Sequence, residues 1–156
     1  MKIVFLGDIV GSSGREAVFN SIKNIKEKYE PEIIIANAEN SASGYGLSKK
    51  IAKELFDHGI DVLTLGNHAW DQREMLSFIE ECPKIIRAIN YPKGVPGRGE
   101  FKIILEDGRS FIVIQVMLRL FMGLSLDDPF SIIDKRLSSE FLGNTCNGIF
   151  IDLHGE

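Results

Sequence analysis

The sequence predicts an α/β protein with a mainly parallel sheet in its first half and a β-hairpin in its second half. Short apolar runs alternate with amphipathic helical stretches as far as residue 89, which is the order of repeated βαβ units. An Asp-Gly pair then joins two further apolar runs, the strongest short-range signal for a hairpin. With 44% hydrophobic and 26% charged residues, the 156 residues are expected to form a single domain, 1–156, with a substantial core.

The strands of the parallel sheet are predicted by four runs rich in β-branched residues, each followed by a loop signal. The runs are Lys2–Gly7, Glu32–Asn37, Asp61–Gly66 and Lys84–Ile89. They are apolar at successive positions rather than at alternate ones, which is typical of strands that are covered on both sides. The pattern of residues alone therefore predicts helices on both faces of this sheet.

The stretches between these strands predict helices. Over Gly14–Lys28, apolar residues recur at helical spacing along one face. Ser48 is a candidate N-cap for the second helix and Asp71 for the third. Later in the chain, a proline in the first turn predicts a helix that starts near Asp127-Asp128-Pro129.

The remaining strands belong to the second half. Phe101–Leu105 and Phe111–Val116 are joined by Glu106–Arg109, which contains the Asp-Gly pair of the predicted hairpin. Gly148–Glu156 predicts a last strand that reaches His154.

Composition limits the classes of function. A net charge of −4 argues against stable nucleic-acid binding, because a phosphate backbone needs clustered lysine and arginine. No stretch approaches the ~20 apolar residues of a membrane span, and the first residues lack the features of a signal peptide. The two cysteines, Cys82 and Cys146, are far apart and are expected to be unpaired thiols. A cytoplasmic protein without a membrane partner is expected.

Residue types that bind metals follow the predicted strands where each strand ends. They are Asp8, the pair Glu39 and Asn40, the pair Asn67 and His68, and His154. Because the carboxyl ends of parallel strands meet at one edge of a sheet, these side chains are expected to converge. Carboxylate, amide and imidazole groups suit Mn, Fe or Zn, and a carboxylate such as Glu39 can bind two ions at once.

Each of these residues also has a purely structural interpretation. Asp8 could cap a helix, Asn67 could occupy a turn, and His68 could be a surface histidine. Their coincidence at four strand ends favours the metal site.

The glycine-rich loop Gly7–Arg15 suggests a different class of site, a dinucleotide-binding loop with Glu39 as the ribose-binding acid. The G-x-G-x-x-G spacing is absent, however, and so is the Lys-Ser/Thr of a P-loop. Ser12 and Ser13, with the helix N-terminus, are instead candidates for holding a substrate phosphate.

The motifs together resemble a known family. "GD" after the first strand and "GNH" after the third are similar to the calcineurin-like metallophosphoesterases. The segments "FLGDIVGSSGR", "NAENSASGYGLS", "LTLGNHAWD", "LDDPF" and "IDLHGE" resemble the bacterial YmdB-like metallophosphoesterases, whose members act as 2',3'-cyclic-nucleotide phosphodiesterases. The resemblance implies an α/β/β/α sandwich, in which the hairpin strands belong to a second sheet.

The resemblance also implies roles for the candidate residues. It implies a first metal on Asp8, Glu39 and Asn40, and a second metal on Glu39, Asn67 and His154. His68 becomes a catalytic acid or base beside two divalent metal ions, with Fe or Mn preferred and Zn or Mg as alternatives. The expected substrate is a small phosphodiester or nucleotide.

The sequence departs from the family pattern in two places. The family continues after its "HxE" segment to a Gly-Thr-His-Thr-His segment that completes the metal site, and this sequence has none, so a C-terminally incomplete form is expected. Gln115 and Leu118 replace the usual Asn and Gly. Three hypotheses result: a dinuclear phosphodiesterase, an impaired remnant that binds metal weakly and tends to form a homo-oligomer, and a nucleotide-binding domain.

Overall fold

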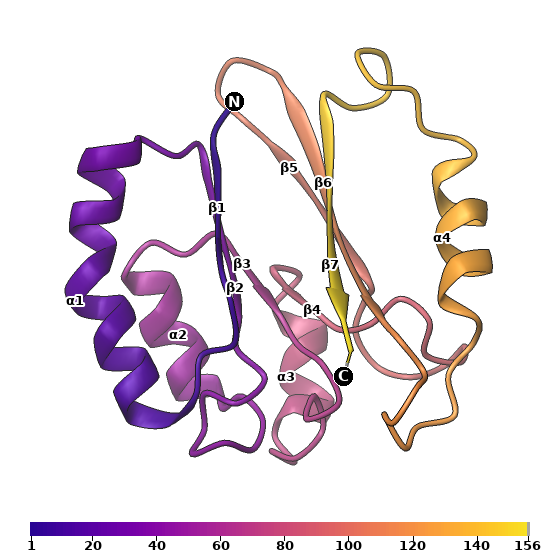
Figure 1. Ribbon diagram of the computed structural model, residues 1–156, viewed down its shortest axis with the longest axis horizontal. Helices are drawn as coiled ribbons and strands as arrows, with labels where there is room; N and C mark the ends of the chain where they lie inside the picture. The colour runs from indigo at the N-terminus through magenta and orange to yellow at the C-terminus, as the bar shows by residue number, and fades with distance from the viewer. Residues whose placement is uncertain (156) are drawn as a thin grey trace.

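The computed structural model describes residues 1–155 and has four layers, in the order α/β/β/α (Figure 1). The elements are β1 (Ile3–Leu6), α1 (Gly11–Tyr29), β2 (Ile33–Asn37), α2 (Lys49–Asp57), β3 (Val62–Thr64), α3 (Met75–Glu81), β4 (Ile85–Ile86), β5 (Glu100–Ile104), β6 (Ser110–Met117), α4 (Pro129–Leu137) and β7 (Gly148–His154). The sandwich that the family resemblance implied is confirmed.

The first sheet is parallel and has the strand order β1-β2-β3-β4. Each strand lies next to the one that precedes it in the chain, so the connections move across the sheet in one direction. Right-handed crossovers then place α1, α2 and α3 on a single face. Ile22, Leu55 and Ile79, one from each helix, belong to the same buried cluster as Ile34 and Leu63 of the sheet. The prediction of helices on both faces is therefore wrong.

The second sheet covers the other face of the first. β5 and β6 form the predicted hairpin, and β7 runs parallel to β6. Phe111 and Val113 of β6 pack against Ile33 and Ile35 of β2 between the two sheets. α4 packs on the outer face of the second sheet, as Figure 1 shows at its right side. A sheet needs an apolar partner on each buried face, and here that partner is another sheet rather than a helix.

One of the two predicted helix caps and the predicted start of the last helix are confirmed. The Ser48 side chain accepts a hydrogen bond of 3.2 Å from the backbone N–H of Ile51 at the start of α2. Asp128 accepts one of 3.0 Å from Phe130 at the start of α4, with Pro129 in the first turn.

The cap predicted for α3 is wrong. This helix begins at Met75, its N-cap residue is Glu74, and no side chain caps it. Asp71 lies four residues before the first helical residue and bonds to His68 instead.

The layer between the sheets becomes polar toward the carboxyl ends of the strands. Side chains alternate between the two faces of a strand, so every second residue points into this layer. The apolar Ile33, Ile35 and Val62 are followed along their strands by Asn37 on β2 and Thr64 on β3. On the second sheet, the apolar Phe111, Val113 and Phe150 are likewise followed by Gln115 on β6 and Asp152 on β7. The predicted site residues come next, where β1, β2, β3 and β7 end at the lower side of Figure 1.

Cys82 and Cys146 are free thiols, as predicted. Among the helices formed by residues 1–155, none has the length and apolar character that a bilayer crossing requires.

Candidate functional site

Glu39 lies at the centre of the site and is only 2% exposed. Its Oε1 lies 2.9 Å from Nε2 of His154, and its Oε2 accepts a hydrogen bond of 3.0 Å from the backbone N–H of His68. The Oδ1 of Asn67 lies 3.1 Å from the same Nε2 of His154. Side chains from the ends of β2, β3 and β7 therefore meet at one buried carboxylate, as the sequence predicted.

The backbone after β2 fixes the position of Glu39. The Asn37 side chain accepts a hydrogen bond of 3.1 Å from the N–H of Glu39, which turns the chain at the end of the strand. The N–H of Ala38 donates to the carbonyl of Thr64 over 2.9 Å, and the Ser41 hydroxyl donates to the carbonyl of Ala38 over 2.7 Å. The turn is thus attached to β3, which carries the next pair of site residues.

Asp8 and Asn40 form the second part of the site. The Nδ2 of Asn40 donates a hydrogen bond of 2.7 Å to Oδ2 of Asp8. The loop after β1 is joined to the loop after β2 by backbone bonds from Ile9 to Asn37 (3.0 Å) and from Gly11 to Asn40 (2.9 Å). The loop that carries Asp8 is therefore fixed to the loop that carries Glu39 and Asn40.

His68 has a side-chain partner that the sequence analysis missed. Its Nδ1 lies 2.7 Å from Oδ2 of Asp71, and its ring contacts the ring of Tyr45 edge to face at 5.7 Å. A carboxylate on one ring nitrogen fixes the orientation of a histidine and leaves the other nitrogen for a reaction partner. The "HAWD" spacing was the available signal for this pair.

Ser12 and Ser13 lie in the first turn of α1 and are exposed. Within residues 1–155 they make no hydrogen bond to the other predicted site residues. Their predicted role in holding a phosphate stays a prediction.

Gly66 makes the close packing of the site feasible. A Cβ atom at this position would lie 2.2 Å from Oε2 of Glu39 and 2.6 Å from Nε2 of His154, well inside van der Waals contact. Sequence analysis assigned Gly66 only to the end of a strand.

We expect Gly66→Ala to disrupt the Glu39–His154 pair, because both side chains must move to admit the methyl group. Metal affinity, measured by calorimetry with Mn²⁺, should fall at least tenfold if this pair binds metal. Gly94→Ala is the control, because a Cβ atom there meets no atom within 4 Å; unlike Gly66, Gly94 has a positive φ of 91°, which adds some backbone strain to the control. Equal Mn²⁺ affinity in the wild type and in Gly66→Ala would contradict this expectation.

The buried pair shifts the pKa of both partners. The hydrogen bond with Glu39 raises the pKa of His154, and the charges of Glu39, Asp152 and Asp8 act in the same direction against the effect of burial. Burial alone would raise the pKa of Glu39, but the bonds from His154 and from the His68 backbone outweigh it and lower that pKa. An ion pair is therefore favoured in the metal-free chain.

A pH dependence of stability follows from this pair. His154 has a raised pKa in the folded chain, so its contribution is fully present below its ordinary value of 6.5 and is lost as the pH rises through the raised value. In the presence of a chelator, the free energy of unfolding measured with urea should therefore fall as the pH rises above 6.5. Glu39→Gln should flatten this fall, and an equally steep fall in that variant would show that the pair is not its cause.

The polar part of the layer between the two sheets, next to the site, contains side chains with unsatisfied hydrogen-bonding atoms. Among residues 1–155, Oγ1 of Thr64, both polar side-chain atoms of Gln115, and Oδ2 of Asp152 are buried without a hydrogen-bond partner. Burial raises the pKa of Asp152. Buried polar atoms are normally satisfied, so apolar packing does not explain why these side chains lie between the sheets. The sequence marked Gln115 only as a departure from the family pattern.

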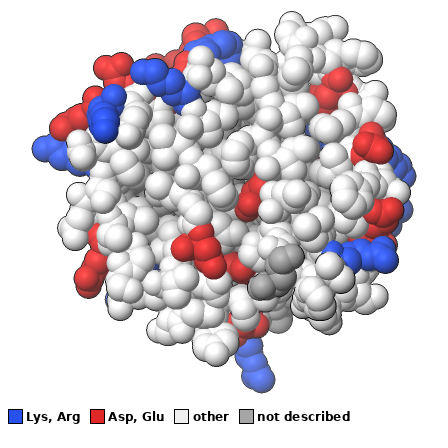
Figure 2. Space-filling model, viewed as in Figure 1, with Lys and Arg blue, Asp and Glu red and all other residues white. Residues whose placement is uncertain are grey.

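The site is rich in carboxylates. Asp71 contacts His68, Glu39 contacts His154, and Asp8 contacts Asn40. Figure 2 shows acidic side chains in the lower central part of this face, with most lysines and arginines toward its rim. By itself such a site would repel an anionic phosphodiester. In the part of the chain that the structure describes, no group of three or more His, Cys, Asp or Glu side chains is already arranged around a common ion position.

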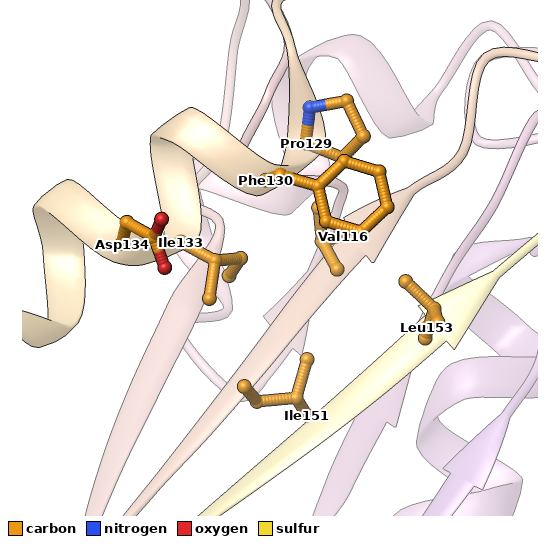
Figure 3. A pocket seen from close by; sticks show the side chains of 7 residues that line it. All are labelled: Val116, Pro129, Phe130, Ile133, Asp134, Ile151 and Leu153. Atoms are coloured by element: carbon orange, nitrogen blue, oxygen red, sulfur yellow. The ribbon is translucent and has the colours of Figure 1, made fainter.

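A separate hollow lies on the outer face of the second sheet, between α4 and the strands β6 and β7 (Figure 3). It has a volume of about 370 Å³ and is lined mainly by apolar side chains. The lining residues are Val116, Pro129, Phe130, Ile133, Asp134, Ile151 and Leu153. None of the predicted site residues lines it.

Comparison with solved structures confirms the class of fold. A protein of Thermus thermophilus, described as hypothetical, superposes with a TM-score of 0.89 at 36% identity, over the whole of this chain and 58% of its own. A protein from Mycoplasma pneumoniae, described as a novel phosphatase, gives a TM-score of 0.88 at 26% identity, over the whole of this chain and 56% of its own.

The sequence comparison identifies the family. The model of the YmdB-like proteins matches residues 4–156, and the chain belongs to this family. The 2',3'-cyclic-nucleotide 2'-phosphodiesterase of Bacillus subtilis (strain 168) is 40% identical to it over 156 residues. That match covers all of this chain and 58% of the relative, so the chain spans somewhat more than half the length of the relatives that it matches.

Proposed function

We propose that the chain is a metal-dependent phosphodiesterase that hydrolyses small phosphodiesters such as 2',3'-cyclic nucleotides. The observation that carries this proposal is the buried Glu39 carboxylate, which contacts His154 with one oxygen and the backbone of His68 with the other. The name of the Bacillus subtilis relative supports the choice of substrate.

The donor atoms suit two divalent metal ions, with iron or manganese preferred. Asn40, next to Glu39 in the chain, contacts Asp8, and Asn67 contacts His154, which itself contacts Glu39. Oxygen and imidazole donors without thiolate favour such ions. The surplus of carboxylates also agrees with this assignment, because bound cations would compensate it.

Each residue then has a role. Asp8 and Asn40 would hold one ion, Asn67 and His154 the other, and Glu39 would bind both. When bound, two divalent ions supply positive charge for the phosphoryl oxygens and activate a water molecule for attack. His68 would donate a proton to the leaving oxygen, and Asp71 would hold its ring in the orientation that this transfer needs.

The experiment is an assay of the purified chain with 2',3'-cyclic AMP and bis(p-nitrophenyl) phosphate. We expect hydrolysis of both diesters with Mn²⁺ or Fe²⁺ and none after treatment with a chelator. The monoester p-nitrophenyl phosphate is assayed in parallel to measure phosphatase activity. Turnover that survives chelation, or its absence with every metal tried, would contradict the proposal.

A further inference from the structure

We propose that Tyr45 contacts the substrate and stacks on the nucleobase of a cyclic nucleotide whose phosphodiester lies at Glu39 and His68. This inference rests on the proposed function and adds a determinant of specificity to it. It concerns Tyr45, in the loop between β2 and α2, which sequence analysis included only as part of a family motif.

The Tyr45 ring lies beside the proposed acid. Its centroid is 5.7 Å from the centroid of the His68 ring, and the two planes are nearly perpendicular, at 88°. Tyr45 is nevertheless 64% exposed. The contact therefore covers little of the phenol ring, which remains accessible to a planar partner directly next to the group that would reach the leaving oxygen.

The backbone of Tyr45 is held in place although its ring is exposed. Its carbonyl accepts a hydrogen bond of 2.7 Å from Nε2 of Gln72, and its N–H donates to the carbonyl of Ala42 over 3.1 Å. The flanking Gly44 and Gly46 have φ values of 87° and 79°, a conformation that other residues rarely adopt. The chain thus presents this ring in one position.

The same loop is attached to the proposed metal ligands. The N–H of Gly44 donates to the carbonyl of Asn40 over 2.9 Å, so the exposed ring and the ligand pair Asn40 and Asp8 belong to one hydrogen-bonded unit. Scattered exposed aromatic residues are common on protein surfaces. Tyr45 differs from them because its backbone is fixed and its ring borders the reactive histidine.

An aromatic ring in this position favours substrates that carry a nucleobase over substrates that do not. Loss of one aromatic–base stack typically weakens binding by about 5- to 150-fold. A tyrosine ring loses little conformational freedom on binding, and its backbone is already ordered here. The expected effect of removing the ring is therefore on the KM of nucleotide substrates more than on kcat.

The test compares 2',3'-cyclic AMP with methyl ribofuranoside 2',3'-cyclic phosphate, which has the same reacting group and no base. Tyr45→Ala should raise KM for cyclic AMP at least fivefold more than KM for the base-free diester. Tyr45→Phe keeps the ring and should restore the preference. Tyr29→Ala removes another exposed tyrosine, at the far end of α1, and is the matched control.

Calorimetry of 3'-AMP binding with Mn²⁺ on the same variants separates this inference from the proposed function. Weaker binding in Tyr45→Ala without any turnover would support the stacking role and reject the phosphodiesterase. Equal effects of Tyr45→Ala on both diesters would reject stacking and leave the phosphodiesterase intact. A wild-type chain that neither binds 3'-AMP nor hydrolyses either diester would overturn both.

Discussion

Replacing Glu39 by glutamine is expected to abolish the proposed metal-dependent phosphodiesterase activity while the fold persists. Glutamine has nearly the same volume, so it can occupy the 2%-exposed position between His154 and the His68 backbone. It removes the negative charge and replaces one potential bridging oxygen with an amide NH₂ group, which cannot bind a metal. The measurements are turnover of 2',3'-cyclic AMP with Mn²⁺ and the circular dichroism of the variant.

The control for this change is Glu27→Gln, which removes an exposed carboxylate on α1. Glu27 forms a surface ion pair with Lys23 at 3.9 Å, and such pairs contribute little to stability. Glu27→Gln should keep wild-type turnover. Near wild-type turnover in Glu39→Gln would rule out the bridging role that we assign to this residue.

Replacing His68 by alanine is expected to lower kcat by about 10²–10⁴-fold, which is the usual contribution of a general acid. Bound metal, measured by elemental analysis after desalting, should change little, because the imidazole of His68 contacts Asp71 and Tyr45 rather than the proposed ligands. Asp71→Asn should give a smaller loss of kcat with the same metal content, because it keeps the ring and weakens only its orientation.

The contrasting variant is Asn67→Ala. The Oδ1 atom of Asn67 lies 3.1 Å from Nε2 of His154, within the proposed ligand set. Loss of this amide should therefore reduce metal content together with activity. If His68→Ala and Asn67→Ala lose metal to the same extent, His68 is a ligand and its assignment as the acid is wrong.

The strands of the first sheet could be predicted from the sequence because the residue patterns that indicate them are local. Buried strands such as Ile33–Asn37 are apolar at successive positions, and each ends in a short segment of polar residues. The rule that ligands collect at the carboxyl ends of parallel strands then brought together Glu39, Asn67 and His154 although 115 residues separate the first from the last. His154 ends a strand of the second sheet, so its contact with Glu39 also depends on how the two sheets pack on each other.

The layer that covers the face of the first sheet opposite its helices could not be predicted from the residues alone. An apolar run such as Phe111–Val116 shows that a strand is buried, but the run does not show whether a helix or another sheet covers it, and only the family resemblance indicated a second sheet. Asp71 was predicted to cap α3 because a carboxylate just before a helix often does so. Here its carboxylate contacts the His68 ring instead. The roles of Gly66 and Tyr45 depend on distances across the fold, which no local pattern encodes.

Electron paramagnetic resonance of the chain with Mn²⁺ in excess tests most directly whether Glu39 joins two metal ions. A shared carboxylate requires centres about 3.5–4 Å apart, and two Mn²⁺ ions at that distance give an exchange-coupled spectrum. We predict two Mn²⁺ per chain with a coupled signal in the wild type, and a loss of coupling in Glu39→Gln. Saturation with a single Mn²⁺, or two ions without coupling, would contradict the dinuclear site.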